Sequence, residues 1–111
     1  MKEKVGIKTM LQGKKIIITG AASGIGRATA VLAAHEGADI AIADIDRQGA
    51  EETAKLIQAK GRDSLIIEMD TSLATDAKRM VEETVARFGT VDGIVCGAIK
   101  LRPAKLEDLT V

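Results

Sequence analysis

The sequence predicts an α/β fold, a doubly wound parallel sheet of four strands and three helices in a single domain spanning residues 1–111. Short apolar runs rich in β-branched residues alternate with longer helical patterns, which is the order expected of parallel strands joined by crossover helices. The first run, residues 15–19, is continuous rather than alternating, as in a strand that is buried on both faces. Right-handed crossovers then place the strands in the order 3-2-1-4.

The bounds of these elements follow from the same patterns. The predicted strands cover residues 15–19, 39–44, 64–68 and 93–96. The predicted helices cover residues 25–36, 47–60 and 73–88. Glycine often ends a helix because it adopts a positive φ without strain. Each predicted helix is followed directly by a glycine, namely Gly37, Gly61 and Gly89.

The apolar side of each predicted helix gives a candidate core. In the first helix it consists of Ile25, Thr29, Leu32 and Ala33. In the second helix it consists of Ala50, Ala54 and Ile57. In the third helix, whose predicted N-cap is Ser72, it consists of Ala77, Met80, Val81, Thr84, Val85 and Phe88. Because the chain has one Phe and no Trp or Tyr, this core must be almost wholly aliphatic.

Composition and charge argue against several classes of function. Lys and Arg together number 16, as do Asp and Glu, so no basic excess favours a nucleic-acid surface. No apolar run approaches the roughly eighteen residues that a membrane span needs, and residues 1–15 lack the apolar core of a signal peptide. The single cysteine excludes an internal disulfide and suits a reducing compartment, so we expect a cytoplasmic protein. The sequence contains no cluster with metal-ligand spacing.

A glycine-rich turn follows the first predicted strand, with the sequence Thr-Gly-Ala-Ala-Ser-Gly-Ile-Gly at residues 19–26. Gly20 permits a tight turn, Gly24 lets the backbone approach a pyrophosphate, and Gly26 lets the helix pack close to the strand. The N-terminus of the following helix offers free N–H groups and a positive dipole end to phosphates. The alternative is a glycine-rich turn without a ligand. We predict a dinucleotide site here that also includes Ala22, Ser23 and Ile25.

Asp44 ends the second predicted strand, about twenty residues after the glycines. A carboxylate at this place accepts hydrogen bonds from the adenosine ribose hydroxyls and repels the 2′-phosphate of NADP. We therefore predict NAD rather than NADP as the cofactor, and we assign the next residue, Ile45, to the same site. The alternative is that Asp44 only caps the loop before the next helix. Arg47 could pair with a 2′-phosphate, but a solvated surface arginine is the simpler interpretation.

Residues 11–109 resemble the N-terminal, Rossmann-like part of the short-chain dehydrogenase/reductase family. Residues 19–26 match every fixed position of that family's Thr-Gly-x-x-x-Gly-x-Gly fingerprint. By resemblance, Asp44 is the ribose-binding aspartate of NAD-preferring members, and Asp70 is an aspartate that contacts adenine, with Thr71 beside it. The resemblance implies hydride transfer between NAD and an alcohol or a carbonyl compound. Without the resemblance, Asp70 is simply a loop residue after the third strand.

The stretch after the fourth predicted strand departs from the family pattern. Members usually carry Asn-Asn-Ala-Gly there, whereas this chain has Cys96, Gly97, Ala98 and Ile99. By resemblance, the first three would line the cofactor, and Ile99 in place of glycine would crowd it. Cys96 itself is predicted to be buried and inert, and His35 is predicted to be a surface residue.

The catalytic residues of the family have no counterpart in this sequence. Its catalytic Ser and its Tyr-x-x-x-Lys motif lie well past the fourth strand, and these 111 residues contain no Tyr. We therefore expect the chain by itself to be a truncated cofactor-binding half that catalyses nothing. The alternatives are a non-catalytic nucleotide-binding module and an oligomerising module. Because Ile94 and Val95 would lie on an uncovered sheet edge, we predict a homo-oligomer.

Overall fold

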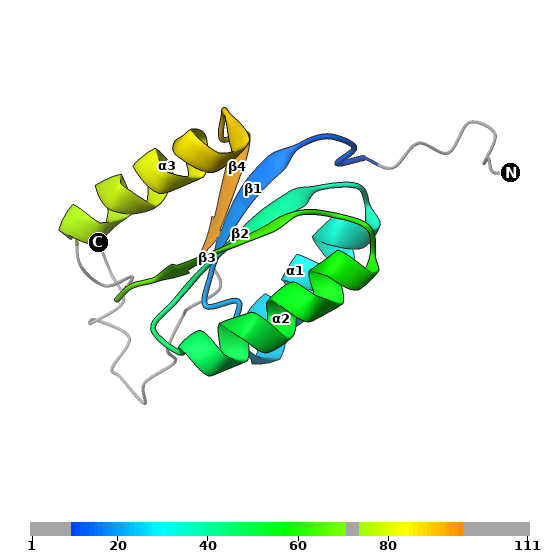
Figure 1. Ribbon diagram of the computed structural model, residues 1–111, viewed down its shortest axis with the longest axis horizontal. Helices are drawn as coiled ribbons and strands as arrows, with labels where there is room; N and C mark the ends of the chain where they lie inside the picture. The colour runs from blue at the N-terminus through cyan, green and yellow to red at the C-terminus, as the bar shows by residue number, and fades with distance from the viewer. Residues whose placement is uncertain (1–9, 71–73, 97–111) are drawn as a thin grey trace, which may run out of the picture.

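The computed structural model describes residues 10–70 and 74–96. Along the chain the elements are β1 (Lys15–Thr19), α1 (Gly24–His35), β2 (Asp39–Asp44), α2 (Arg47–Ala59), β3 (Ser64–Glu68), α3 (Ala74–Phe88) and β4 (Gly93–Cys96). The strands form one parallel sheet in the order β3-β2-β1-β4, so the predicted fold and strand order are confirmed (Figure 1). The strand bounds agree with the prediction. Ser72, the predicted N-cap of the third helix, lies outside the described residues.

The helices cover both faces of the sheet. α1 and α2 lie together on one face, and α3 lies on the other (Figure 1). Ile16 and Ile18 of β1 pack in the core with α1 and α2, whereas Ile17 packs in the core with α3. Successive side chains of a strand point to opposite faces, so a strand between two helical layers has to be apolar throughout. The interpretation of the first run as a strand buried on both faces is therefore confirmed.

The apolar face predicted for α1 is wrong in two of its four members. Ile25 and Leu32 are 82% and 61% exposed, whereas Thr29 is half-buried and Ala33 is buried. The residues that α1 buries are Gly26, Ala30, Ala33 and Ala34. These small side chains let the helix approach the sheet closely, and the bulkier residues then point sideways from it. Side-chain size misled the prediction, because the closest packing face of this helix is its least bulky one.

The two other helices agree better with the prediction. α2 buries the predicted residues Ala50, Ala54 and Ile57. α3 turns toward the sheet a stripe of buried or half-buried residues, Met80, Val81, Thr84 and Phe88. Ala77 and Val85 were also predicted for this stripe, but both are exposed because they lie on its flanks. Among the described residues, no helix combines the length and the apolar character needed to cross a bilayer.

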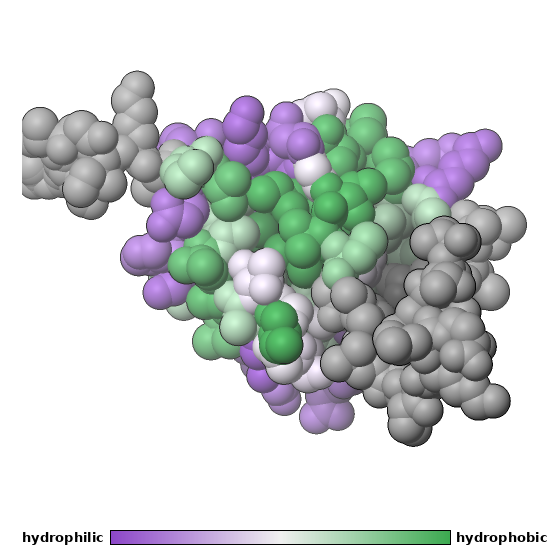
Figure 2. Space-filling view, turned by 180° about the vertical axis from the view of Figure 1, so that it is seen from behind, coloured by the Kyte–Doolittle hydropathy of each residue, from purple (hydrophilic) through white to green (hydrophobic). Residues whose placement is uncertain are grey.

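One edge of the sheet and the flank of α1 beside it are uncovered. Among the described strands, β4 pairs with β1 alone, and its Ile94 and Val95 are 47% and 40% exposed. Val95 also lines an apolar cavity of about 310 Å³ together with Leu32 of α1 and with Met10. Figure 2 shows hydrophobic residues gathered on the side of the molecule that faces away from the viewer in Figure 1. The predicted exposure of this strand edge is confirmed within the described part of the chain.

At the amino ends of the strands, the Asp39 carboxylate binds two cationic side chains. It lies 2.5 Å from Lys15 Nζ and 3.1 Å from Arg62 Nη2, and it accepts a hydrogen bond of 2.9 Å from the N–H of Asp63. Burial raises the pKa of this carboxyl. The hydrogen bonds from Lys15 and Asp63 and the charges of Arg62 and Lys15 lower the pKa by more, so that it lies below its ordinary value of 3.8.

We expect Asp39→Asn to lower the free energy of unfolding near neutral pH by about 2 kcal/mol, because two cations lose their shared carboxylate. A carboxyl with a lowered pKa in the folded state stabilises the fold above its unfolded pKa, and this contribution is lost as pH falls through the folded value. The native chain should therefore lose stability below about pH 4 more steeply than the variant. Urea unfolding at several pH values across this range measures how steeply the free energy of unfolding falls with pH for the native chain and for the variant. Glu82→Gln, at an exposed carboxylate of α3, is the matched control. Equal slopes for Asp39→Asn and the native chain would contradict this account.

Candidate functional site

The carboxyl ends of the four strands lie along one edge of the sheet. The register pairs Thr19 at the end of β1 with Cys96 of β4, and Asp44 at the end of β2 with Glu68 of β3. After β1 the chain continues to β2 on one side, whereas β4 lies on the other side, so the strand order reverses between β1 and β4. Ligands of doubly wound sheets bind outside the carboxyl ends at such a reversal. The glycine-rich turn, residues 20–23 between β1 and α1, occupies this place.

Three glycines in and beside this turn have conformations or contacts that a side chain would disturb. Gly20 and Gly24 have φ values of 71° and 58°, in the left-handed region that favours glycine. A Cβ on Gly26 would lie 2.0 Å from the carbonyl oxygen of Gly20, far inside contact distance. α1 therefore packs against the turn at a distance that only glycine permits, which agrees with the packing role predicted for Gly26.

The N-terminus of α1 has no side-chain cap. Ser23 is the N-cap residue, its backbone is extended with φ −162°, and its hydroxyl makes no capping hydrogen bond. The N–H groups of the first helical turn have no acceptor inside the helix, and together with the helix dipole they form a positive end. α2 differs, because the Asp46 carboxylate at its N-cap accepts a hydrogen bond of 3.0 Å from the N–H of Gly49. An anion is therefore favoured at the start of α1 and disfavoured at the start of α2.

Asp44 lies beside the turn and is bonded to it. Its Oδ2 accepts a hydrogen bond of 3.1 Å from the N–H of Ala22, and its Oδ1 accepts one of 2.9 Å from the N–H of Asp46. The second bond is the loop-capping role considered as the alternative, whereas the first ties the end of β2 to the turn. Each carboxylate oxygen has two lone pairs, and the side chain is partly exposed. Both oxygens therefore remain able to accept hydrogen bonds from a ligand.

The remaining predicted site residues fall into two groups. Ile45, next to Asp44, is 67% exposed at the same edge. Asp70 directly follows the buried Met69, whose N–H donates to the carbonyl oxygen of Asp44 at 3.0 Å, so Asp70 lies near the end of β2. The others lie outside the described residues, namely Thr71, Gly97 and Ala98.

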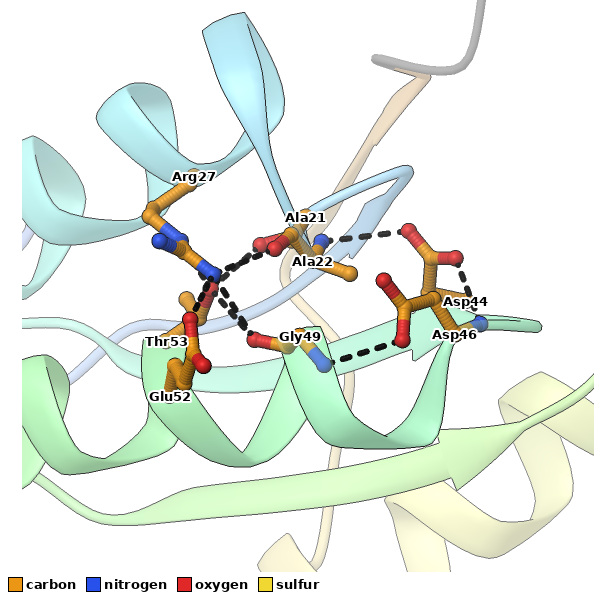
Figure 3. A network of polar contacts seen from close by, with 8 residues as sticks. All are labelled: Ala21, Ala22, Arg27, Asp44, Asp46, Gly49, Glu52 and Thr53. Carbon is orange, nitrogen blue, oxygen red and sulfur yellow. Dashed lines mark hydrogen bonds and ion pairs between the residues drawn. The ribbon is translucent and has the colours of Figure 1, made fainter.

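Sequence reasoning missed a polar network behind the turn (Figure 3). Arg27 of α1 donates to the carbonyl oxygens of Ala22 and Gly49, at 2.6 and 3.1 Å. The buried Thr53 of α2 donates to the carbonyl oxygen of Ala21 at 2.7 Å. A threonine on the buried face of a helix is a signal that was available, because a buried hydroxyl needs a hydrogen-bond partner. Nothing comparable in the sequence distinguishes Arg27 from a surface arginine.

Charged side chains near the site are largely paired with one another. Arg47 is exposed and makes ion pairs with Glu51 and Glu68, at 3.2 and 3.8 Å, which agrees with its interpretation as a surface arginine. His35 is exposed at the end of α1, as predicted. Over residues 10–70 and 74–96, the structure brings together no group of three His, Cys, Asp or Glu side chains that could hold a metal ion.

The prediction that Cys96 is buried is wrong, because its thiol is free and exposed. Cys96 ends β4, which is an edge strand of the described sheet, so its outer side has no neighbouring strand. In the parallel register it lies opposite Thr19. The thiol therefore lies at the same edge of the sheet as the glycine-rich turn.

We expect iodoacetamide to modify Cys96 in the folded chain as completely as in the urea-unfolded chain, because the thiol is already exposed. Intact-mass spectrometry after a timed reaction measures the modified fraction. The control is Cys96→Ser, which removes the chain's single cysteine and should take up no label. Modification that requires urea would contradict the exposed position of this thiol.

Comparison with known sequences gives one consistent result. The family model for short chain dehydrogenase matches residues 14–111. An uncharacterized oxidoreductase of Thermotoga maritima is 44% identical over 87 residues, a match that covers 78% of this chain and 34% of the relative. The 2,5-dichloro-2,5-cyclohexadiene-1,4-diol dehydrogenase of Sphingobium indicum is 41% identical, with 75% of this chain and 32% of the relative covered. The chain thus spans about a third of the length of these curated relatives.

Solved structures agree with the sequence comparison. A short chain dehydrogenase from Mycobacterium paratuberculosis bound to NAD superposes with a TM-score of 0.78 at 34% identity, covering 90% of this chain and 42% of that structure. An NAD⁺-bound xylitol dehydrogenase superposes with a TM-score of 0.73 at 30% identity, covering 77% of this chain and 33% of that structure. The described fold therefore corresponds to part of a longer fold in both proteins.

Proposed function

The chain belongs to the short chain dehydrogenase family, and we propose that it forms the dinucleotide-binding part of an oxidoreductase. The observation that carries this proposal is the contact between α1 and the turn, where a Cβ on Gly26 would lie 2.0 Å from the Gly20 oxygen. This packing places the uncapped start of α1 against the turn, beside Asp44. The proposed binding residues in the described part are Gly20, Ala22, Ser23, Gly24, Ile25, Gly26, Asp44, Ile45, Asp70 and Cys96. Thr71, Gly97 and Ala98 complete the proposed set.

The turn and the start of α1 suit a pyrophosphate. A doubly charged anion needs several N–H donors and little side-chain bulk in front of them, and the first turn of α1 offers such donors. At Gly24 the space that a Cβ would take is open, with no heavy atom within 4 Å. The Ser23 hydroxyl is exposed and makes no capping bond, so it can donate to a phosphate oxygen as well.

We propose NAD rather than NADP as the cofactor. The free lone pairs of the Asp44 carboxylate suit the two hydroxyls of an adenosine ribose, whereas a 2′-phosphate would bring negative charge against this carboxylate. The start of α2 gives such a phosphate no compensation, because Asp46 already caps it. Arg47 gives little either, because its guanidinium is paired with Glu51 and Glu68.

For the whole oxidoreductase we propose hydride transfer between NAD and an alcohol or a carbonyl compound. This proposal is supported by the family and by the two similar structures that have NAD bound. The 111 residues contain no Tyr, so the role proposed for this chain is to hold the dinucleotide. When bound, the nicotinamide supplies the hydride chemistry, and the residues of this chain fix the phosphates and the adenosine ribose.

A fluorescence titration with NADH and NADPH tests this proposal. The chain has no Trp or Tyr, so its own emission does not obscure that of the reduced nicotinamide. We expect saturable binding of NADH that NAD displaces. We expect the affinity for NADPH to be lower than that for NADH by a factor of roughly ten or more. Absence of saturable NADH binding at millimolar concentration would contradict the proposed function. Equal affinities for NADH and NADPH would contradict the preference for NAD alone.

The uncovered sheet edge favours a second proposal, that the 111-residue chain self-associates. Ile94 and Val95 are exposed on β4, whose outer edge has no partner among the described strands, and Leu32 extends the apolar surface onto α1. A second copy offers an identical edge, and unpaired edges of this kind readily pair with one another. Light scattering over a concentration series tests this, with Val95→Lys as the variant that should remain monomeric. A monomeric native chain at every concentration would contradict the proposal.

A further inference from the structure

We propose that Arg27 and Thr53 are positioning residues that hold the glycine-rich turn in its phosphate-binding conformation. The inference rests on the proposed dinucleotide function and adds to it two residues that contact the turn from behind. Each of them binds a backbone carbonyl oxygen of the turn, so we name the pair the carbonyl clamp (Figure 3).

Thr53 holds the carbonyl group of Ala21. Its side chain is fully buried, and its Oγ1 donates to the Ala21 oxygen at 2.7 Å while it accepts from Arg27 Nε at 2.9 Å. A hydroxyl has a single proton to donate. The carbonyl oxygen of Gly49, at 3.2 Å, is the more distant acceptor. Thr53 is therefore fully committed to the turn and to Arg27, and it has no remaining donor for a ligand.

Arg27 holds the carbonyl group of Ala22. Its Nη2 lies 2.6 Å from the Ala22 oxygen and 3.1 Å from the oxygen of Gly49, which belongs to α2. The donor is charged, and hydrogen bonds from charged donors are shorter and stronger than neutral ones. The side chain is 29% exposed, so water weakens this interaction less than it would at the open surface. One guanidinium thus links α1, the turn and α2.

Gly49 lets α2 come close enough for the clamp to form. A Cβ at this position would lie 2.7 Å from the Ala22 oxygen and 2.6 Å from Asp46 Oδ2. A side chain here would therefore push α2 away from the turn. Gly49 lies inside α2, and its φ is not positive, so its backbone conformation does not require glycine. Glycine is required here because α2 lies so close to the turn.

The clamp sets the direction of N–H groups, because the N–H and the C=O of a trans peptide point in opposite directions. The described peptide bonds are all trans. The peptide that joins Ala21 to Ala22 has its oxygen on Thr53 and its N–H on the Asp44 carboxylate, at 2.7 and 3.1 Å. In the next peptide the Ala22 oxygen points to Arg27, so the N–H of Ser23 points away from it. Loss of the bond to Thr53 would free the Ala21–Ala22 peptide, whose N–H is held by Asp44, and would loosen the turn. Loss of the bond to Arg27 would free the next peptide to rotate and would turn the N–H of Ser23 away from a phosphate.

Two variants of Thr53 separate positioning from packing. Thr53→Val keeps the branched shape and removes the hydroxyl, whereas Thr53→Ser keeps the hydroxyl and removes a methyl group. Arg27→Met removes the guanidinium and keeps the aliphatic stem. Glu52→Gln is the matched control, because the exposed Glu52 carboxylate contacts Arg27 at 3.1 Å and its described hydrogen bond goes to Arg27 and not to the turn.

The readouts are the dissociation constants of NADH and of adenosine, which has no phosphate, with circular dichroism as the check of folding. We expect Thr53→Val and Arg27→Met to weaken NADH binding about tenfold and to change adenosine binding less than about twofold. Thr53→Ser and Glu52→Gln should bind NADH as the native chain does. Equal losses for NADH and adenosine, or no loss for either, would overturn the proposal. If Thr53→Val fails to fold, the more exposed Arg27→Met decides between these outcomes.

Amide hydrogen exchange in the ligand-free chain tests the carbonyl clamp without any dinucleotide, so its result does not depend on the proposed function. We expect the amides of Ala22 and Ser23 to exchange about tenfold faster in Arg27→Met than in Glu52→Gln, because the freed turn opens locally. Unchanged exchange at both amides would overturn the clamp. If the native chain binds no NADH, the proposed function fails, and the exchange rates alone then decide whether the clamp orders the turn.

Discussion

Gly26→Ala is expected to abolish measurable NADH binding and to lower the free energy of unfolding by about 3 kcal/mol or more. The added Cβ would lie 2.0 Å from the carbonyl oxygen and 2.6 Å from the carbonyl carbon of Gly20. Both are backbone atoms, so no side chain can rotate to make room. Either α1 moves away from the sheet or the turn changes its path. Both changes separate the uncapped start of α1 from the turn that it faces, and the phosphate site is lost with them.

Gly61→Ala is the control for this prediction. Gly61 has φ +80° at the end of α2, and the space around its would-be Cβ is open. Its replacement should cost about 1 kcal/mol of backbone strain and leave NADH affinity unchanged. Urea unfolding and the NADH titration measure the two effects on the same samples. Native-like stability and affinity in Gly26→Ala would show that the close contact between α1 and the turn is not required.

Asp44→Ala is expected to weaken NADH binding about 30-fold, equivalent to about 2 kcal/mol from lost charge-assisted hydrogen bonds. The affinity for NADPH should fall much less, because removing the carboxylate also removes its repulsion of the 2′-phosphate. Part of the NADH loss is indirect, since the N–H of Ala22 loses the acceptor that now lies 3.1 Å away. The ratio of the two dissociation constants isolates the direct effect, because a disordered turn would weaken both cofactors equally.

Two comparisons sharpen the test of Asp44. Glu82→Ala removes an exposed carboxylate of α3, on the other face of the sheet, and should leave both affinities unchanged. The titration of Asp44→Ala with NADPH shows whether selectivity has shifted. A variant that loses NADH and NADPH affinity in the same proportion would indicate that Asp44 acts only through the turn and contacts no ribose.

Much of the fold could be predicted because burial on both faces leaves a direct trace in the sequence. Because β1 is buried on both faces, its successive central positions all had to be apolar, and all are isoleucine. The glycine after each helix marked the end of that helix. The orientation of α1 could not be predicted in this way. Its bulky residues Ile25 and Leu32 are exposed, and small residues make the close contact with the sheet instead. A prediction that assigns the largest apolar side chains to the core selects the wrong face of a helix that packs closely against a sheet.

The residues of the candidate site also separate into those that the sequence could identify and those that it could not. The glycines and Asp44 could be identified because each depends on local backbone geometry at a fixed distance along the chain. Arg27 could not, because its role depends on how closely α2 approaches the turn, and that distance is a property of the tertiary packing. The place of Thr53 on the buried face of α2 was a usable signal, but the carbonyl group that it binds could not be predicted. The burial of Cys96 was predicted wrongly for a related reason. Its surroundings depend on which strand lies beyond β4, and the residue type alone favours the interior.

The central claim is that a dinucleotide binds at the carboxyl edge of the sheet, between the start of α1 and the end of β2. Amide chemical-shift mapping of the ¹⁵N-labelled chain during an NADH titration tests this claim most directly. We expect the saturating shift changes to cluster at residues 20–26, at Asp44 and Ile45, and at Asp70. Saturating changes confined to the outer groove between α1 and α2, around Val31 and Leu56, or an unchanged spectrum at millimolar NADH, would contradict it.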